Sequence, residues 1–218
     1  MRRRESRNLW SMAAAGETKS ERRLRSRNAT RTGILDAARR VAARDGARNM
    51  SLRATAAEAG FAPAALYGYF RNKDELLLAL ASDDLSVIAR AMRVAMERSD
   101  AASPLAAASA AALGLLQQTE TIAAASAALR HPSEQNEPER IFNGRLIAAL
   151  NALSRATGQS LESRTAQIDV ILLAAVLTGL AVLARSGRLS ALGFETEELV
   201  ERLDARFTGA ARRQKECI

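Results

Sequence analysis

The sequence predicts an all-α protein, and three observations lead to this prediction. Alanine, leucine and arginine, which all favour helix, are the most frequent of its 218 residues. Only four prolines and twelve glycines interrupt the chain, and 48% of the residues are hydrophobic, enough to bury a sizeable core. Basic residues gather near the N-terminus. We therefore expect a small domain over residues 29–80 and a larger helical domain over residues 81–210, followed by a tail over residues 211–218.

The net positive charge of the protein comes from the first third of the chain. Residues 1–28 hold nine basic and three acidic side chains, residues 29–80 hold eight and five, and residues 81–218 hold fifteen and sixteen. This asymmetry indicates a polyanion as the partner of the N-terminal part. We expect residues 1–28 to form a disordered basic arm whose Arg25 and Arg27 enter a DNA minor groove. Non-specific attraction by a solvated tail explains the same charges equally well.

Three helices are predicted in the first domain. The first begins after Thr30 as N-cap and ends at Gly46, because apolar residues recur between them at helical spacing. The second, LRATAAEA, follows Ser51 as N-cap and ends at Gly60. A third, short helix begins at Pro63, a residue favoured in the first turn of a helix.

A fourth, longer helix follows, with Asn72 as its N-cap and acidic residues in its first turn. Two short helices joined by a glycine turn and preceded by a longer helix predict a helix-turn-helix unit. In the third helix Leu66 and Phe70 share an inner face and are expected to be buried. Tyr67 and Tyr69 fall on other faces. Their hydroxyls, with the Lys73 ammonium, can contact DNA phosphates; the alternative is that these aromatic rings only join the third helix to the fourth.

The stretch from Ile34 to Leu76, with its LYGYFRNKDEL segment, resembles the DNA-binding domain of TetR-family transcriptional regulators. The resemblance covers roughly residues 30–80. It implies a homodimer that places each third helix in a major-groove half-site of a palindromic operator, and a helical C-terminal domain that dimerises and binds a small effector. It also implies that Tyr67, Tyr69 and Lys73 contact phosphates and that Arg53 reaches a base edge. The full expected DNA-contacting set is Arg25, Arg27, Ser51, Arg53, Pro63, Ala64, Ala65, Tyr67, Tyr69 and Lys73.

This sequence departs from the family pattern at three positions. Ala62 and Ala65 stand where the family often has serine and threonine, so two hydroxyls are missing. Base readout then depends on apolar contacts to thymine methyl groups and on Arg53. Thr55 replaces a usual aliphatic core residue, and we expect its hydroxyl to bond to the carbonyl of Ser51 or Leu52.

The C-terminal domain is predicted as a series of helices. Pro104 opens one that runs to Arg130, Pro138 opens one that ends at Gly158, a third spans about Leu161 to Arg185, and a last one spans Glu195 to about Phe207. The third of these is apolar on nearly every face. We interpret it as a buried helix in preference to a membrane span, because residues 168–184 are only marginally long enough to cross a bilayer and include an acid.

An apolar surface on that helix, together with the last helix, predicts a symmetric dimer interface. The alternative is burial within one chain. The expected interface residues are Ile168, Val176, Leu180, Leu199, Leu203 and Phe207. A small, apolar or weakly polar effector is expected between helices at Leu116, Gln117, Glu120, Phe142, Leu146, Ile171 and Leu172. The alternative is that these positions are packed core, which is the more frequent role of such a stripe.

Several functions are disfavoured by what the sequence holds. One cysteine, Cys217, and one histidine, His131, allow no Cys/His metal site, and we expect no cofactor, no metal and a reducing, cytoplasmic location. The sequence has no glycine-rich phosphate loop and no serine with a nearby base, so these motifs give no support to an enzyme. We therefore predict a dimeric DNA-binding transcriptional regulator, a repressor released by its effector. The alternative is a nucleoid-associated or structural DNA-binding dimer without an effector.

Overall fold

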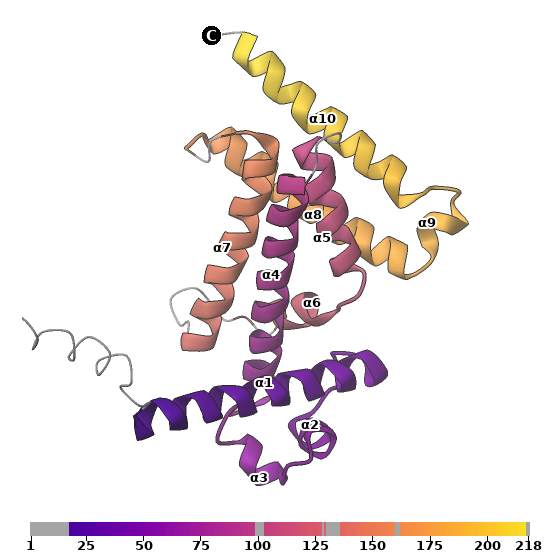
Figure 1. The fold of residues 1–218 in the computed structure, drawn as a ribbon. Coiled ribbons are helices and arrows are strands. Elements are labelled where there is room, and N and C mark those ends of the chain that lie inside the picture. The colour runs from indigo at the N-terminus through magenta and orange to yellow at the C-terminus, as the bar shows by residue number, and fades with distance from the viewer. Residues whose placement is uncertain (1–17, 99–102, 128, 130–135, 160–161, 217–218) are drawn as a thin grey trace, which may run out of the picture.

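The computed structural model describes residues 18–98, 103–127, 129, 136–159 and 162–216, and every regular element in that part of the chain is a helix (Figure 1). The all-α prediction is confirmed. In chain order the helices are α1 (Lys19–Asp45), α2 (Leu52–Ala59), α3 (Pro63–Leu66), α4 (Lys73–Arg98), α5 (Pro104–Leu116), α6 (Thr121–Ser126), α7 (Glu137–Thr157), α8 (Arg164–Arg185), α9 (Arg188–Ala191) and α10 (Thr196–Glu216).

The N-terminal domain consists of α1, α2, α3 and the first turns of α4. Helix α1 runs across the base of the molecule, with α2 and α3 beneath it and α4 rising from it (Figure 1). The apolar positions of α1 predicted from the sequence are buried, and they meet apolar residues of the two short helices and of α4. The shared core includes Ile34, Leu35, Ala38, Val41, Leu52, Ala56, Leu66, Phe70 and Leu76. Apolar burial on this scale is what holds two helices as short as α2 and α3 in place.

Helix α1 begins twelve residues earlier than predicted. Its N-cap is Thr18, whose Oγ1 accepts from the Glu21 backbone N–H at 3.2 Å while Glu21 accepts from the Thr18 N–H at 2.7 Å. This reciprocal capping box satisfies backbone donors at the helix start. The expectation of an unfolded arm is therefore wrong for residues 19–28, and residues 1–17 lie outside the described residues. Thr30 is not a cap but an interior residue, whose hydroxyl donates to the Ser26 carbonyl at 3.0 Å.

Helix α4 joins the two domains as one continuous element. It leaves the N-terminal domain and becomes the central helix of the C-terminal domain, where α5, α6 and α7 pack around it and α8 and α10 lie farther out (Figure 1). Its residues Leu76–Ser82 are buried in an unbroken run, because α1 covers one side of this segment and the C-terminal helices cover the others. A rotation of α4 would therefore move the N-terminal domain relative to the rest of the molecule.

Three predicted boundaries in the C-terminal domain are corrected by the structure. The helix expected from Pro104 to Arg130 is broken between α5 and α6, because the hydroxyls of Thr119 and Thr121 both donate to the Asp84 carboxylate of α4. Helix α8 begins at Arg164, and Leu161 lies outside the described residues. The last helix continues to Glu216, so the backbone of the expected tail is helical over residues 211–216.

Asp84 of α4 belongs to a chain of polar contacts that links α1 to α8. Arg39 of α1 contacts it at 3.5 Å and the neighbouring Asp83 at 3.3 Å. On the other side of Asp84, the segment between α5 and α6 receives Arg185 of α8, which donates to the Thr119 carbonyl at 3.0 Å and pairs with Glu120 at 3.3 Å. Polar contacts therefore run from the N-terminal domain through α4 to α8.

Candidate nucleic-acid interface

The turn between α2 and α3 has the geometry predicted for a helix-turn-helix. The Ser51 hydroxyl accepts from the Ala54 N–H at 3.1 Å and starts α2, and Gly60 ends it in the left-handed conformation, with φ at 73°. A side chain at Gly60 would be strained at that φ. Pro63 then opens α3, as predicted. Both ends of α2 and the start of α3 are thus fixed by local residues.

The face of α3 directed away from the core consists of small side chains. Pro63, Ala64 and Ala65 are exposed, whereas Leu66 is fully buried and anchors the helix on the opposite side. Arg53 of α2 is exposed as well. A helix with short exposed side chains can bring its backbone close to a partner surface, but it offers few side-chain hydrogen bonds of its own.

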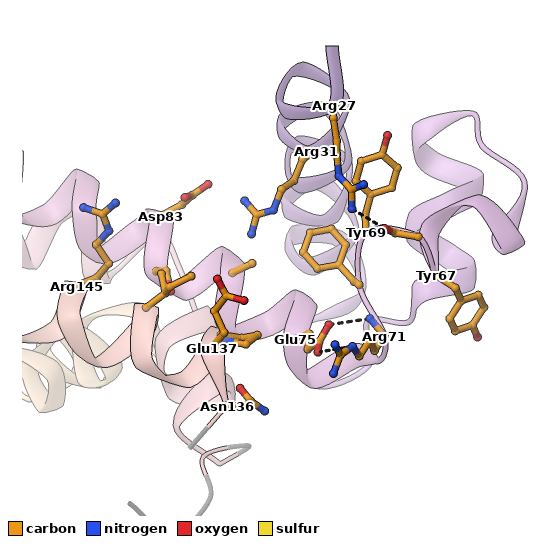
Figure 2. Close-up of a pocket in the computed structure, with 16 residues that line it drawn as sticks. Arg27, Arg31, Tyr67, Tyr69, Arg71, Glu75, Asp83, Asn136, Glu137 and Arg145 are labelled. Carbon is orange, nitrogen blue, oxygen red and sulfur yellow. Dashed lines mark hydrogen bonds and ion pairs between the residues drawn. The ribbon is translucent and has the colours of Figure 1, made fainter. Parts of the chain in front are cut away.

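The aromatic residues after α3 divide between core and surface, as predicted. Leu66 and Phe70 are buried, while Tyr67 is 60% exposed and points away from the protein body (Figure 2). Tyr69 is half-buried and lies beside the Arg27 guanidinium, whose central carbon is 5.4 Å from the ring centre. The Tyr67 hydroxyl is therefore free to reach an external acceptor, whereas the Tyr69 ring is held within the domain.

Lys73 is fixed at the start of α4. Its ammonium donates to the carbonyl of Arg48, in the segment between α1 and α2, and retains two further N–H donors. The Asn72 side chain caps α4 as predicted, accepting from the Glu75 N–H at 2.9 Å. The Glu75 carboxylate in turn accepts from the Arg71 N–H at 2.8 Å. Lys73 thus connects the start of α4 to the segment between α1 and α2 while keeping donors for a further acceptor.

Arg25 and Arg27 lie on helix α1, not on the flexible arm that the sequence suggested. Arg27 donates to the Gly68 carbonyl at 3.1 Å, a contact between residues 41 positions apart in the sequence (Figure 2). One turn further along, the Arg31 guanidinium lies 5.3 Å from the centre of the Phe70 ring. Arg31 was not among the predicted residues. The Thr18–Glu21 capping pattern in the sequence indicates a helix that starts after Thr18. Arg27 and Arg31, four residues apart in that helix, then lie on the same face.

Further ion pairs connect α1 to α2. Arg40 contacts Glu58 at 2.7 Å and Arg44 contacts it at 3.1 Å. These two guanidinium groups, Arg40 more strongly, lower the pKa of the Glu58 carboxyl below its ordinary value. Thr55 on the same helix differs from expectation. It is completely buried and its hydroxyl has no hydrogen-bond partner, so the predicted bond to Ser51 or Leu52 is wrong.

The predicted effector residues lie at different depths in the described part of the chain. Phe142 is 1% exposed in the core, while Ile171 and Leu172 are 57% and 52% exposed on the outer side of α8. Glu120 is at the surface in its ion pair with Arg185. Leu116, Gln117 and Leu146 are half-buried. An effector site made of all seven residues would require a second chain or a rearrangement.

Helix α8 has one buried and one exposed apolar face. Ala166, Val170, Leu173, Leu177 and Ala181 are buried against the domain. The opposite face, which we call the α8 stripe, consists of Ile168, Ile171, Leu172, Val176, Val182 and Leu183, each at least 37% exposed. Within the described residues, α8 is the one helix whose length and composition would suit a membrane span. The expectation of a buried helix thus holds for one face only.

The predicted interface residues separate into two groups. Ile168 and Val176 belong to the α8 stripe, and Leu180 is half-buried at its edge. Leu203 and Phe207 of α10 pack against the core of their own chain, and Leu199 is half-buried. A shallow groove lies between the two helices where Leu172, Val176 and Phe207 meet. The α8 stripe also includes Val182 and Leu183, which were not predicted, and Ile171 and Leu172, which were expected at the effector site.

Comparison with known families identifies the N-terminal domain. Residues 34–80 match the family model described as "Bacterial regulatory proteins, tetR family". A segment of 62 residues is 44% identical to the HTH-type nicotine-responsive transcriptional repressor HdnoR of Paenarthrobacter nicotinovorans. That segment covers 28% of this chain and 32% of the relative, so the chain matches about a third of the length of this curated relative.

Solved structures resemble nearly the whole fold. A TetR-family transcription regulator from Marinobacter aquaeolei superimposes with a TM-score of 0.58 at 21% identity, over 85% of this chain and 97% of that one. The regulator FadR from Bacillus subtilis, solved in complex with stearoyl-CoA, gives a TM-score of 0.58 at 19% identity, over 81% of this chain and 97% of that one. At these identities the likeness concerns the fold.

Proposed function

We propose that this chain, whose residues 34–80 match the TetR family and whose fold resembles a TetR-family regulator, is a homodimeric, sequence-specific transcriptional repressor in the cytoplasm. In this proposal α3 enters the major groove and a small molecule lowers the affinity for the operator. Repression follows if the bound dimer occupies the DNA that the transcription machinery requires.

The observation that carries the proposal is the exposed surface around α3. Its small side chains, Pro63 to Ala65, allow close approach to base edges, and Tyr67 and Lys73 offer hydroxyl and ammonium donors for phosphates. Arg53 can read a guanine through two hydrogen bonds. We assign base reading to α3 and Arg53, and phosphate contacts to Tyr67, Lys73 and the exposed Arg25.

The α8 stripe supports dimerisation. Six large aliphatic side chains on one helix face are exposed in a single chain, and a second copy would remove them from water. A two-fold axis there would carry two copies of α3 to adjacent major grooves, about 34 to 36 Å apart. The operator would then be a palindrome with half-sites about one helical turn apart.

Release by an effector is supported by the position of α4. This helix belongs to both domains, so a molecule that shifts it in the C-terminal domain also reorients α3. A coupling of about 1 to 3 kcal/mol would change DNA affinity roughly 5- to 150-fold. We propose an apolar or weakly polar effector. The relatives named above respond to nicotine or hold stearoyl-CoA, so they agree on ligand response and not on one ligand.

Selection of bound duplexes from a random DNA pool tests the proposal. The full-length protein is used at about physiological salt, because non-specific attraction to phosphates falls steeply with salt. A palindromic motif with half-sites one turn apart is the expected result. Enrichment without a common motif would contradict sequence-specific repression and favour the nucleoid-associated or structural DNA-binding dimer.

A further inference from the structure

A cleft of about 730 Å³ separates the N-terminal domain from the start of α7 (Figure 2). One wall is formed by α1 and the turn that follows α3, and the other by residues 136–145, from the cap of α7 into its second turn and beyond. The cleft is distinct from the predicted effector positions, none of which lines it. It is also adjacent to Tyr67 and Tyr69, so whatever occupies it lies beside the proposed DNA-contacting residues.

The charges around the cleft do not balance after internal pairing. Two of its carboxylates are engaged: Glu75 accepts from the Arg71 N–H, and Asp83 pairs with Arg39. Arg71 itself is 3.8 Å from Glu75. The remaining lining charges are Arg27, Arg31, Arg145 and Glu137. Because Arg39 is shared between Asp83 and Asp84, the whole lining is the fairer count: four arginines face three carboxylates, which leaves the cleft with one positive charge in excess.

Aromatic rings hold two of these arginines in place without neutralising their charge. Arg31 lies over the Phe70 ring at 5.3 Å and Arg27 lies over the Tyr69 ring at 5.4 Å. Stacking orients a guanidinium but leaves its in-plane N–H groups available to an acceptor. Arg27 uses one of them on the Gly68 carbonyl. Arg31 forms no ion pair with any acid of the described chain, so its five donors are available in the cleft.

The opposite wall supplies a matching cation. Arg145 is exposed on α7 and forms no ion pair with a described residue, and in Figure 2 it lies on the far side of Asp83 from Arg31. The lining also holds apolar side chains, Ala79 of α4 and Ile141 of α7, beside the carboxylate of Asp83. Planar guanidinium groups bind carboxylate and phosphate oxygens through paired hydrogen bonds. Arginines on both walls, with the apolar Ala79 and Ile141 in the same lining, suit an anion that has a hydrocarbon part.

We propose that this cleft binds a small organic oxyanion, a carboxylate or a phosphate ester, bridging Arg31 of the N-terminal domain and Arg145 of the C-terminal domain. The ligand would bring negative charge next to Tyr67, Tyr69 and Arg27. Resting on the proposed DNA-binding function, the consequence is that such an anion lowers DNA affinity, because it fixes the domain orientation and reduces the positive potential beside the phosphate contacts. The site would act in addition to an effector site in the C-terminal domain.

Isothermal titration calorimetry of the full-length protein without DNA tests binding directly. The probes are inorganic phosphate, glutarate and octanoate, each at the same ionic strength maintained with sodium chloride. Phosphate and glutarate separate the phosphate from the carboxylate source, and octanoate tests for the hydrocarbon part. We expect saturable binding of at least one probe. Its affinity should fall about tenfold or more in Arg31→Gln and in Arg145→Gln, because each substitution removes a charged hydrogen bond.

Arg140→Gln is the matched control, because Arg140 is exposed on the same helix, loses the same charge and does not line the cleft. It should bind the probe as the unmodified protein does. Equal affinity of Arg145→Gln and the unmodified protein for every probe, or the absence of saturable binding, would overturn the proposal and leave the DNA-binding proposal intact.

DNA affinity measured by fluorescence anisotropy separates the cleft from the DNA-binding surface. Without a probe, Arg145→Gln should bind DNA as the Arg140→Gln control does. With the bound probe, DNA affinity of the unmodified protein should fall about fivefold or more, and that of Arg145→Gln should not. If Arg145→Gln alone weakened binding to all DNA sequences relative to the control, the cleft would be part of the DNA phosphate interface and the small-anion proposal would be wrong.

Discussion

The two exposed faces suited to a partner, the α3 surface and the α8 stripe, differ in the side chains they present. The α3 surface exposes Pro63 to Ala65 with Tyr67 and Arg53 beside them, whereas the α8 stripe exposes large aliphatic side chains from Ile168 to Leu183. Small side chains surrounded by hydrogen-bond donors suit DNA, because its grooves must be approached closely and its phosphates accept hydrogen bonds. Large aliphatic residues suit a partner that buries apolar area. The difference fits the proposal that DNA binds the α3 surface and a second copy of the chain covers the α8 stripe.

The largest expected effect comes from placing a charge in the α8 stripe. Val176→Arg would leave a guanidinium in the centre of the proposed dimer interface, so we expect a monomer at micromolar concentration. A monomer engages one half-site, so operator affinity should fall by roughly 100-fold or more. Analytical ultracentrifugation and fluorescence anisotropy measure the two consequences. Val87→Arg, an exposed valine of α4 outside the stripe, is the control and should remain dimeric. An intact Val176→Arg dimer would remove the α8 stripe from the interface.

A smaller effect should divide the α3 surface into base-reading and phosphate-contacting parts. Arg53→Ala should cost about 1 to 3 kcal/mol on the preferred operator and relax selectivity at one base position. Tyr67→Phe loses one hydroxyl and should cost about 1 kcal/mol on every DNA sequence alike. Anisotropy on the operator and on single-base variants distinguishes the two patterns. Equal weakening by Arg53→Ala on all these duplexes would show that Arg53 contacts phosphate.

The smallest expected effect is on the free energy of unfolding. It is tested by comparing two buried threonines, one in each domain. Thr55 has no partner for its hydroxyl, whereas the Thr157 hydroxyl donates to the Ser154 carbonyl at 2.7 Å. Thr55→Val removes an unsatisfied buried polar atom at nearly constant volume and should raise the free energy of unfolding by about 1 kcal/mol. A melting temperature about 2 to 4 °C higher is the corresponding shift. Thr157→Val should give no such gain. A destabilised Thr55→Val protein would show that its hydroxyl is hydrogen-bonded in solution.

Local signals in the sequence were sufficient for most of the N-terminal domain. Ser51, Gly60, Pro63 and Asn72 act within four residues of their own position, and each has the structural role predicted for it. The start of α1 was also encoded locally, by the Thr18 capping box, although the prediction took Thr30 instead. The burial of Leu66 and Phe70 followed from their spacing along one helix face.

What the sequence determined by itself was therefore the helical class, the helix-turn-helix and the residues that cap it, because caps and periodicity depend on neighbours in the chain. Tertiary structure alone decided which face of α8 is exposed, where the helix after Pro104 breaks and where Arg27 points. Those outcomes depend on residues far apart in sequence, such as Thr121 with Asp84, 37 positions away, and Arg27 with Gly68, 41 positions away. A contact across such a separation leaves no periodic pattern along the chain, so it appears only when the packed helices bring its two members together.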